Sequence, residues 1–273
     1  MTKKNKCEEC AKVCPTKAVD FDDRASNVTR NVSRVVLATG IEPVDACEVP
    51  RLGYGTIPDV VSSVDVERIL NERGRVARPS DGSPPRKVAV VQCVGSRSEK
   101  NGVQYCSKFC CKYGTKIAQL MMESDPDMDL DFYFMDLRTL YEPQEDFKRW
   151  AKDMKRKVEK KKVPRVRLIR SMPSQASRGE DGRVLLRSSG ETDSEVTETS
   201  YDLVMLSVGM RPRALPESLA SSLQVSYDEF GFVGCASDDS RVVMLGAACE
   251  PMDIEETVAR AIAGAATVRK EAD

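Results

Sequence analysis

The chain has 273 residues, of which 41% are hydrophobic and 31% charged, and its formal net charge is −1. This balance is typical of a globular protein and gives no reason to expect a nucleic-acid partner. The chain has no histidine, which excludes His-ligated haem or zinc, Rieske centres and Ser-His or Cys-His catalysis. No apolar run approaches roughly 18 residues and the N-terminus has no apolar signal segment, so we expect no transmembrane segment and a cytoplasmic location.

The order of apolar segments predicts an open, mostly parallel α/β sheet. Expected strands lie at 34–38, 87–92, 130–135, 166–169, 184–187, 202–207 and 241–245. Expected helices lie at 64–72, 106–123, 143–162 and 251–270, and segment 41–58 is expected to be a loop. The stretch 188–200 reads as a hairpin tip. The basic run 155–162 is predicted to end a helix, as a solvated face or a docking patch for an acidic partner.

Four cysteines form the strongest motif, with the spacing C-x12-C-x3-C-C: Cys93, Cys106, Cys110 and Cys111. Four thiolates is the number that a [4Fe–4S] cluster needs. Cys93 follows a predicted strand, and the other three lie at the start of the next predicted helix, where Cys106 and Cys110 share a face. A zinc site or ordinary thiols are the alternatives. The adjacent cysteine pair fits zinc poorly, because zinc sites usually show C-x2-C pairs.

A second cysteine motif lies at the N-terminus, where Cys7, Cys10 and Cys14 precede a proline. The spacing matches the end of the ferredoxin run C-x2-C-x2-C-x3-C-P, with Lys4 at the place of the first cysteine. These three thiolates therefore predict a cluster that needs a ligand from elsewhere. The remaining cysteines are isolated and predicted to be small buried residues: Cys47, Cys235 and Cys249.

Three predicted strands end in glycine turns, at Gly40, Gly209 and Gly246. The last turn is followed by a helix that Asp253 can cap. A strand, a glycine turn and a helix N-terminus together can bind an anion or a carbonyl oxygen, because free N–H groups point outward. The alternative is a capped helix without a ligand.

These segments resemble the flavoprotein subunit of heterodisulfide reductases, a family of iron–sulfur flavoproteins with a thioredoxin-reductase-like core. The resemblance rests on the stretches LATGIEPVDA, QCVGSRS, YCSKFCCKYGTKIA, LVMLSVGMRP and LGAACEPMDIEETVARAIAGAA, and it runs from about Cys7 to Ala266. It implies FAD- and NAD(P)-type Rossmann-like domains preceded by a partial ferredoxin-like segment.

The resemblance also implies a domain order. Residues 1–22 match the partial ferredoxin-like segment, and 23–80 the return part of the flavin-binding domain. Residues 81–212 match a nucleotide-domain-like insert that carries a [4Fe–4S] cluster, and 213–273 the rest of the flavin-binding domain.

The residues implied to bind cofactors follow from the same resemblance. The four cysteines of the C-x12-C-x3-C-C motif match the cluster ligands. Residues that match the flavin-binding segments are Thr39, Gly40, Gly246, Ala247, Asp253 and Ile254. Members of the family carry a G-x-G-x-x-G turn that holds the FAD pyrophosphate, which this sequence lacks. Either the chain is a fragment, or a separate chain supplies that half, or full FAD binding has been lost.

Two functions are compatible with these expectations. The first is an oxidoreductase subunit that passes electrons between FAD and the [4Fe–4S] clusters of partner iron–sulfur subunits. The second is a non-catalytic iron–sulfur relay or scaffold subunit without its own flavin.

Overall fold

The structure is a computed structural model that describes residues 8–100, 102–125, 127–138, 142–158, 161–189, 195–234 and 241–270. It divides into two compact units, Met1–Ser33 and Arg34–Asp273. The described part of the first unit contains one short helix, α1 (Glu9–Val13), which buries none of its side chains. The second unit contains all the other described elements.

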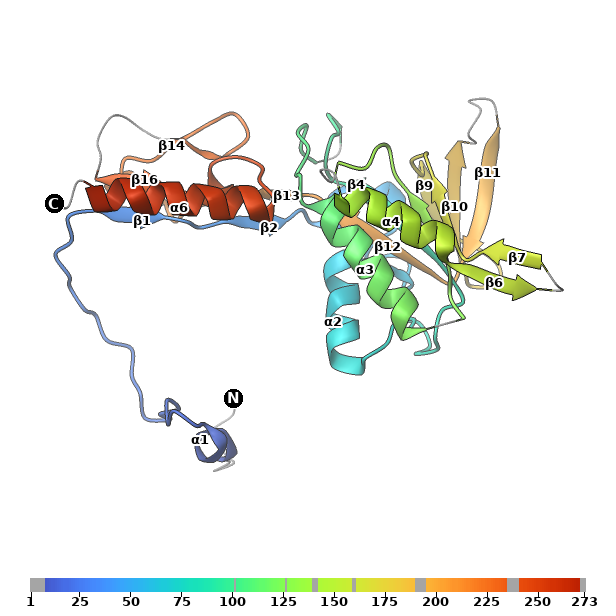
Figure 1. The fold of residues 1–273 in the computed structure, drawn as a ribbon, viewed down its shortest axis with the longest axis horizontal. Coiled ribbons are helices and arrows are strands. Elements are labelled where there is room, and N and C mark those ends of the chain that lie inside the picture. The colour runs from blue at the N-terminus through green and yellow to red at the C-terminus, as the bar shows by residue number, and fades with distance from the viewer. Residues whose placement is uncertain are drawn as a thin grey trace. The chain divides into compact units, whose positions relative to one another are not determined.

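A five-stranded sheet forms the centre of the larger unit (Figure 1). Its strands are all parallel and lie in the order β3 (Val60–Ser62), β12 (Leu203–Val208), β4 (Lys87–Val94), β5 (Asp129–Tyr133) and β8 (Val166–Ile169). Strands β12 and β4 are buried almost throughout, as expected for a parallel sheet that is covered on both faces. The predicted parallel α/β sheet is confirmed.

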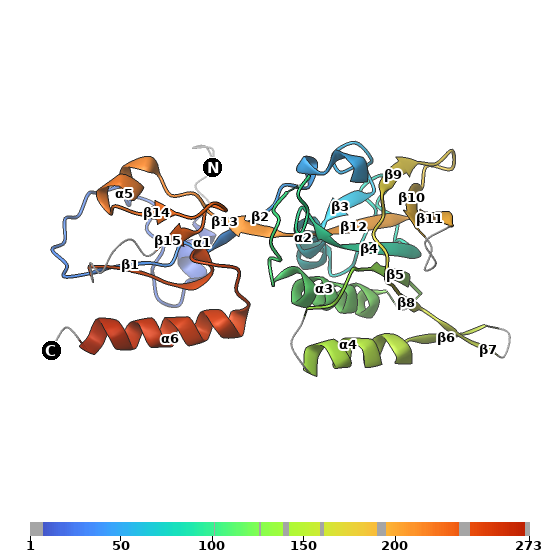
Figure 2. The same ribbon diagram turned by 90° about the horizontal axis from the view of Figure 1, so that it is seen from above.

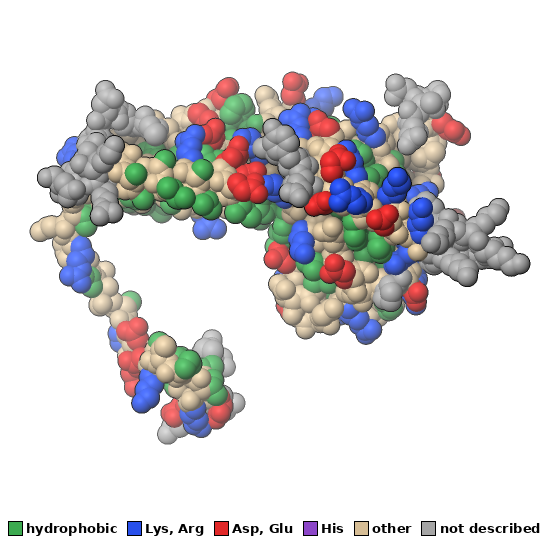
Figure 3. Space-filling view, in the orientation of Figure 1, with side chains coloured by type: hydrophobic (Ala, Val, Ile, Leu, Met, Phe, Trp, Pro, Cys, Tyr) green, Lys and Arg blue, Asp and Glu red, His purple; other side chains and the backbone are tan. Residues whose placement is uncertain are grey.

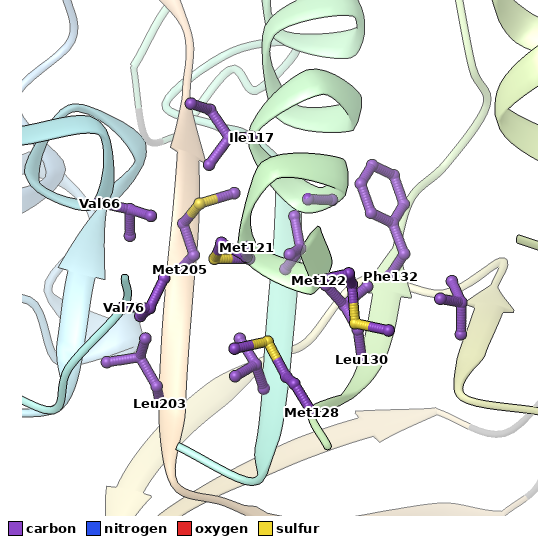
Figure 4. Close-up of a cluster of buried hydrophobic side chains, with 14 of the residues drawn as sticks. Val66, Val76, Ile117, Met121, Met122, Met128, Leu130, Phe132, Leu203 and Met205 are labelled. Atoms are coloured by element: carbon purple, nitrogen blue, oxygen red, sulfur yellow. The ribbon is translucent and has the colours of Figure 1, made fainter. Parts of the chain in front are cut away.

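Three helices cover one face of this sheet: α2 (Ser63–Arg73), α3 (Cys110–Ser124) and α4 (Glu142–Asp153). Val88 and Val90 of β4 point into that core together with Met121 of α3, and Figure 4 shows the interdigitating side chains around Met121. The N-terminus of α2 is fixed by a capping box, in which Ser62 and Asp65 each accept a hydrogen bond from the other's backbone.

The opposite face of the sheet is covered by a smaller antiparallel sheet of β9 (Gln175–Arg178), β10 (Val184–Ser189) and β11 (Val196–Tyr201) (Figure 2). Two turns of 3₁₀ helix, Ala46–Glu48 and Pro50–Leu52, complete that layer. Ala89 and Val91 alternate with Val88 and Val90, so they face this second core.

The remaining elements form a second lobe of the same unit. In it β1 (Val35–Leu37) pairs in parallel with β16 (Val242–Met244), beside helix α6 (Ile254–Lys270). The lobe also holds α5 (Glu217–Ser222) and the β14 (Ser226–Tyr227) and β15 (Val233–Gly234) pair. Antiparallel strands β2 (Ile41–Pro43) and β13 (Met210–Pro212) connect the lobe to the central sheet.

Helix α6 exposes an apolar stripe. Ile254, Val258 and Ile262 are spaced four residues apart and are 69%, 52% and 67% exposed. Figure 3 shows hydrophobic side chains along the outer surface of this helix. Gly264 is buried, where its α-carbon packs against the side chain of Leu245. Such an exposed stripe is unusual for a helix of a complete globular domain.

The prediction of one helix over 143–162 is wrong in its second half. Helix α4 ends at Asp153, and the basic run forms the antiparallel strands β6 (Lys155–Val158) and β7 (Lys161–Pro164). The predicted loop 41–58 also contains strand β2. The tip of the predicted hairpin lies at 190–194, outside the described residues. Among the described residues, no helix is long and apolar enough to cross a membrane.

Candidate functional site

Three cysteine side chains meet where β4 ends and α3 begins. Cys93 lies near the carboxyl end of β4, and Cys110 and Cys111 are the first two residues of α3. Their exposed fractions are 6%, 1% and 3%. The carboxyl ends of parallel strands are the usual place for a ligand in an α/β sheet. We call Cys93, Cys110 and Cys111 the thiol group.

Hydrogen bonds within the thiol group fix where its protons reside. Bonds to Cys111 and Cys93, together with burial, raise the pKa of Cys110 well above that of a free thiol, so Cys110 stays protonated. Hydrogen bonding from Cys110 lowers the pKa of Cys93, and it lowers the pKa of Cys111 to about 7. Thiolates are therefore accessible near neutral pH, and thiolates are the form that binds soft metals.

Cys106 does not lie on α3, contrary to the prediction. The helix begins at Cys110, and Lys108 has φ of 55°, a left-handed conformation that interrupts any helix. The Cys106 Sγ accepts a hydrogen bond from the Lys108 N–H at 3.4 Å. Cys106 and Cys110 therefore do not share a helix face, and hydrogen bonds join the three thiols of the thiol group without Cys106.

The segment 95–109, which we call the cysteine loop, is strained and anchored at several points. Cys93, Arg97 and Lys108 have φ values of 58°, 58° and 55°, and non-glycine residues adopt such values mainly at functional sites. The Ser107 Oγ accepts a hydrogen bond from the Met210 N–H of β13 at 2.8 Å. The Ser96 hydroxyl donates to the Tyr105 carbonyl at 2.9 Å.

Charged side chains border the thiol group. The Arg97 side chain forms hydrogen bonds with the carboxylate of Asp136, which Arg138 also contacts. The Arg138 backbone N–H donates to the Cys111 Sγ at 3.4 Å. Sequence reasoning missed Arg97, Asp136 and Arg138, although Arg97 follows the first cysteine of the motif by four residues.

A cavity of about 190 Å³ opens beside the thiol group. Its lining includes Cys93, Arg97 and Arg51, together with Met135 and Met172. It lies at the end of β4, where the cysteine motif predicts a cluster. A larger cavity of about 670 Å³ lies around α2, and its lining contains none of the thiol group.

The glycine turns of β1 and β16 lie beside each other. The strands pair in register from Val35 with Val242 to Leu37 with Met244, and Thr39 and Gly246 each lie two residues beyond the last pair. Gly40 and Gly246 have φ of 70° and 72°, and a Cβ at Gly40 would meet nothing within 4 Å. This leaves open space for a ligand to approach the backbone.

Other polar groups at these turns also fit the prediction. The buried Thr39 Oγ1 has no hydrogen-bond partner among the described residues. Asp253 caps α6, because its carboxylate accepts from the Glu256 N–H at 2.9 Å, as predicted. Ala247 is half-buried in the turn after β16, and Ile254 is exposed at the start of α6.

Gly209 lies elsewhere than the other two turn glycines. A Cβ at Gly209 would stand 2.7 Å from the Ser96 Cβ and 2.9 Å from the Ser107 Oγ. Gly209 is therefore required for the packing of β13 against the cysteine loop, and it is not part of the Gly40–Gly246 pair.

Ion pairs connect the start of α3, and the loop residue Lys108 before it, to the start of α6. Lys108 Nζ lies 2.8 Å from Glu256 Oε1, and Lys112 Nζ lies 3.1 Å from Asp253 Oδ2. Lys112 also pairs with Glu255. These three contacts tie the helix that carries Cys110 and Cys111 to the segment predicted to approach a flavin.

The N-terminal cysteines lie in the smaller unit. Cys7 lies outside the described residues, and Cys10 is exposed. Cys14 is half-buried, and hydrogen bonds from Thr16 and the Ala18 N–H lower its pKa to about 7. Of the isolated cysteines, Cys47 is exposed and Cys249 half-buried, so neither is the fully buried residue that was predicted, and Cys235 lies outside the described residues.

The residues present fit an iron–sulfur group in their chemistry. Three buried thiols converge, two of them with lowered pKa values, and soft metals select thiolates. The geometry is not that of a closed site: in the described part of the chain, no three Cys, Asp or Glu side chains are placed to hold a metal ion. A fourth thiolate from Cys106 would have to join the other three.

Comparisons with known proteins give one consistent family. The chain is 34% identical over 272 residues to the A subunit of the H2:CoB-CoM heterodisulfide, ferredoxin reductase of Methanothermobacter marburgensis, with 95% of this chain and 40% of that protein covered. It is 31% identical over 274 residues to the A subunit of a ferredoxin/F420H2-dependent CoB-CoM heterodisulfide reductase of Methanosarcina acetivorans, with 96% and 33% covered. The iron–sulfur A subunit of a CoB–CoM heterodisulfide reductase of Methanopyrus kandleri is 34% identical, with 91% and 39% covered.

Two further findings bound this result. No family model matches the chain. Among solved structures, thioredoxin reductase from T. acidophilum superposes with a TM-score of 0.52 at 14% identity, covering 88% of this chain and 66% of that one. This likeness confirms the thioredoxin-reductase-like fold. The chain is thus a relative of the A subunits of heterodisulfide reductases, homologous over nearly all its own length to 33–40% of those proteins.

Proposed function

We propose that this chain is an electron-transfer part of a heterodisulfide-reductase-like oxidoreductase, and that it passes electrons between FAD and [4Fe–4S] clusters of partner subunits. The convergence of Cys93, Cys110 and Cys111 at the end of β4 carries this proposal. The names of the relatives, which include an iron–sulfur subunit and ferredoxin reductases, support it.

In this proposal Cys93, Cys106, Cys110 and Cys111 hold one [4Fe–4S] cluster. A bound cluster would accept and release single electrons. The cysteine loop brings Cys106 within reach, because Ser107 is anchored to β13 next to the thiol group. Burial of the other three thiols keeps water away from the site, and the backbone N–H of Arg138 contributes a hydrogen bond to sulfur.

FAD would lie against the turns of β1 and β16, with Thr39, Gly40, Gly246, Ala247, Asp253 and Ile254 as the contacting residues. The open space at Gly40 and the unpartnered Thr39 hydroxyl support this placement. A polypeptide segment with a glycine-rich turn would hold the pyrophosphate, since the present sequence has no G-x-G-x-x-G. The exposed stripe of α6 is a surface on which such a segment can pack.

The N-terminal cysteines would hold a further cluster only with an added ligand. Cys7, Cys10 and Cys14 supply three thiolates, and Lys4 cannot ligate at neutral pH because its amine is protonated, with a pKa of about 10.4. The site would therefore fill when a partner iron–sulfur subunit supplies the fourth ligand.

A relay or scaffold subunit without flavin is the second candidate, and the missing G-x-G-x-x-G turn favours it. The absorbance spectrum of an acid extract separates the two functions, because released FAD gives flavin bands that cluster iron does not. Metal analysis separates either function from a zinc-bound structural protein.

Iron counting tests the cysteine assignment. We expect Cys106→Ser and Cys110→Ser each to lower iron by about one four-iron cluster per chain, because the group needs four thiolates. Cys47→Ser is the matched control, since Cys47 is exposed and outside the motif. We expect one cluster on the isolated chain; unchanged iron and sulfide in both variants, or two full clusters on the wild-type chain, would contradict the assignment.

A further inference from the structure

Arg97 lies beside the thiol group, because it lines the same cavity of about 190 Å³ as Cys93. Its guanidinium contacts Asp136 through both terminal nitrogens, with Nη2 3.4 Å from Oδ2, and the Asp136 carbonyl oxygen accepts from the Cys111 Sγ at 4.0 Å. The Arg97 side chain is only 20% exposed. A charge in this position is screened by water much less than an exposed one.

The backbone holds Arg97 in place at a cost in strain. Its φ of 58° is unfavourable for a residue with a Cβ. The Arg97 N–H donates to the Tyr105 carbonyl at 3.1 Å, and the Ser98 N–H donates to the Val103 carbonyl at 3.1 Å. These bonds close the cysteine loop on itself, so the direction of the side chain is determined by the loop.

The charges around the thiol group do not cancel. Asp136 is shared by Arg97 and by Arg138, whose Nε lies 3.2 Å from Oδ2. Two guanidinium groups thus share one carboxylate. The Arg138 side chain is 49% exposed and is not part of the cavity lining, whereas the Arg97 side chain is 20% exposed and lines the cavity with Cys93.

We propose that Arg97 is a positioning residue that raises the reduction potential of the cluster assigned to Cys93, Cys106, Cys110 and Cys111; this rests on the proposed function. A cluster gains one negative charge when an external reductant such as dithionite gives it one electron. A guanidinium charge beside a ligand sulfur stabilises that reduced form more than the oxidised form. Because Arg97 is largely buried, its effect exceeds that of an equally charged surface residue.

The test is an anaerobic redox titration of the full chain after reconstitution with iron and sulfide, followed by EPR. We expect Arg97→Gln to shift the midpoint potential to a more negative value at unchanged iron content. Arg138→Gln is the matched control. It removes one positive charge from the same carboxylate, but Arg138 does not line the cavity beside Cys93, so the shift in potential should be smaller. Arg97→Lys keeps the charge and should restore part of the potential.

Equal potentials for wild type and Arg97→Gln would overturn the inference, as would a shift in Arg138→Gln as large as that in Arg97→Gln. If Arg97→Gln does not hold a full cluster, the midpoint potential of the Asp136→Asn variant tests the inference instead. Removing that carboxylate leaves Arg97 uncompensated and should raise the potential, and an unchanged potential would overturn the inference. A wild-type chain that takes up no iron would overturn the proposed function as well, so the two failures are distinct.

Discussion

At the scale of single residues, the site depends on a close approach between β4 and α3. A Cβ added to Gly114 of α3 would stand 2.1 Å from Nε2 of Gln92 and 2.8 Å from the Ser207 Oγ. Gln92 is fully buried and precedes Cys93, and its amide atoms have no partner among the described residues. Glycine at 114 therefore lets the helix that carries Cys110 and Cys111 lie close against the strand that carries Cys93.

We expect Gly114→Ala to lower the free energy of unfolding by about 1–3 kcal/mol, because overpacking of the interior outweighs the gain in helix propensity. The double variant with Gln92→Ala should lose less than the sum of the two single losses, since the shortened side chain makes room. Urea unfolding measures all three. As a control, Gly264→Ala should cost less, because its Cβ would meet the half-buried side chain of Leu245, with Cδ2, Cδ1 and Cγ at 2.5, 2.7 and 3.1 Å, and that side chain can shift toward solvent. If the losses of Gly114→Ala and Gln92→Ala simply add, the contact between position 114 and Gln92 is not the cause of the loss in Gly114→Ala.

At the scale of elements, ion pairs hold α3 against α6. A hydrogen bond from Lys108 lowers the pKa of Glu256, and a backbone hydrogen bond from the Glu256 N–H, followed by Lys112, lowers the pKa of Asp253. The same pairs raise the pKa values of Lys108 and Lys112. Lysines at or just before the start of α3 and carboxylates at the start of α6 therefore link the thiol group to the Gly246 turn.

We expect Lys112→Ala to lower the free energy of unfolding by about 1 kcal/mol at neutral pH and low salt, since partly exposed pairs contribute little each. The carboxylates have lower pKa values folded than unfolded, so their contribution is present above about pH 4 and is lost as the pH falls through the folded values. The lysines have raised pKa values, so their contribution is lost only as the pH rises through values above about 10.4.

Urea unfolding at several pH values and at 1 M salt checks this. Lys116→Ala is the control on the same helix, because Lys116 is exposed and forms no ion pair among the described residues. A loss in Lys112→Ala that persists at pH 3 and at 1 M salt would show that the side chain acts by packing rather than by charge.

At the scale of the whole molecule, the second lobe is an open structure. It contains the two-stranded sheet of β1 and β16 and a helix with an exposed apolar stripe. We expect the isolated chain to lose FAD during gel filtration, because the sequence has no glycine-rich turn to hold the pyrophosphate. Flavin absorbance relative to protein measures this, and stoichiometric FAD after filtration would contradict it. Lumiflavin, which has no pyrophosphate, is the matched ligand and should be held no more weakly than FAD.

Apolar runs located β4 and β12 to within a few residues, because strands that are buried on both faces of a parallel sheet carry such runs. The basic run 155–162 has no periodic apolar residues, so the sequence could not show that it forms the strands β6 and β7 instead of a helix. The spacing of Cys106 and Cys110 suggested that they share one helix face, but the left-handed backbone at Lys108 prevents a helix from spanning both residues. Asp136 was missed because it meets Arg97 across 39 residues of sequence, a separation that local patterns do not encode.

The long-range pairing of β1 with β16 has a consequence for the order of folding. Val35 of β1 pairs with Val242 of β16, so these two strands can meet only after a very long loop closes. The entropy cost of closing a loop rises with its length. Between them, Glu42 of β2 contacts Arg211 of β13 across 169 residues. Once the central sheet forms, β2 and β13 already lie side by side. The segment that still separates β13 from β16 is then much shorter than the whole loop between β1 and β16. We therefore expect the central domain to fold first and to act as the template on which the split lobe assembles.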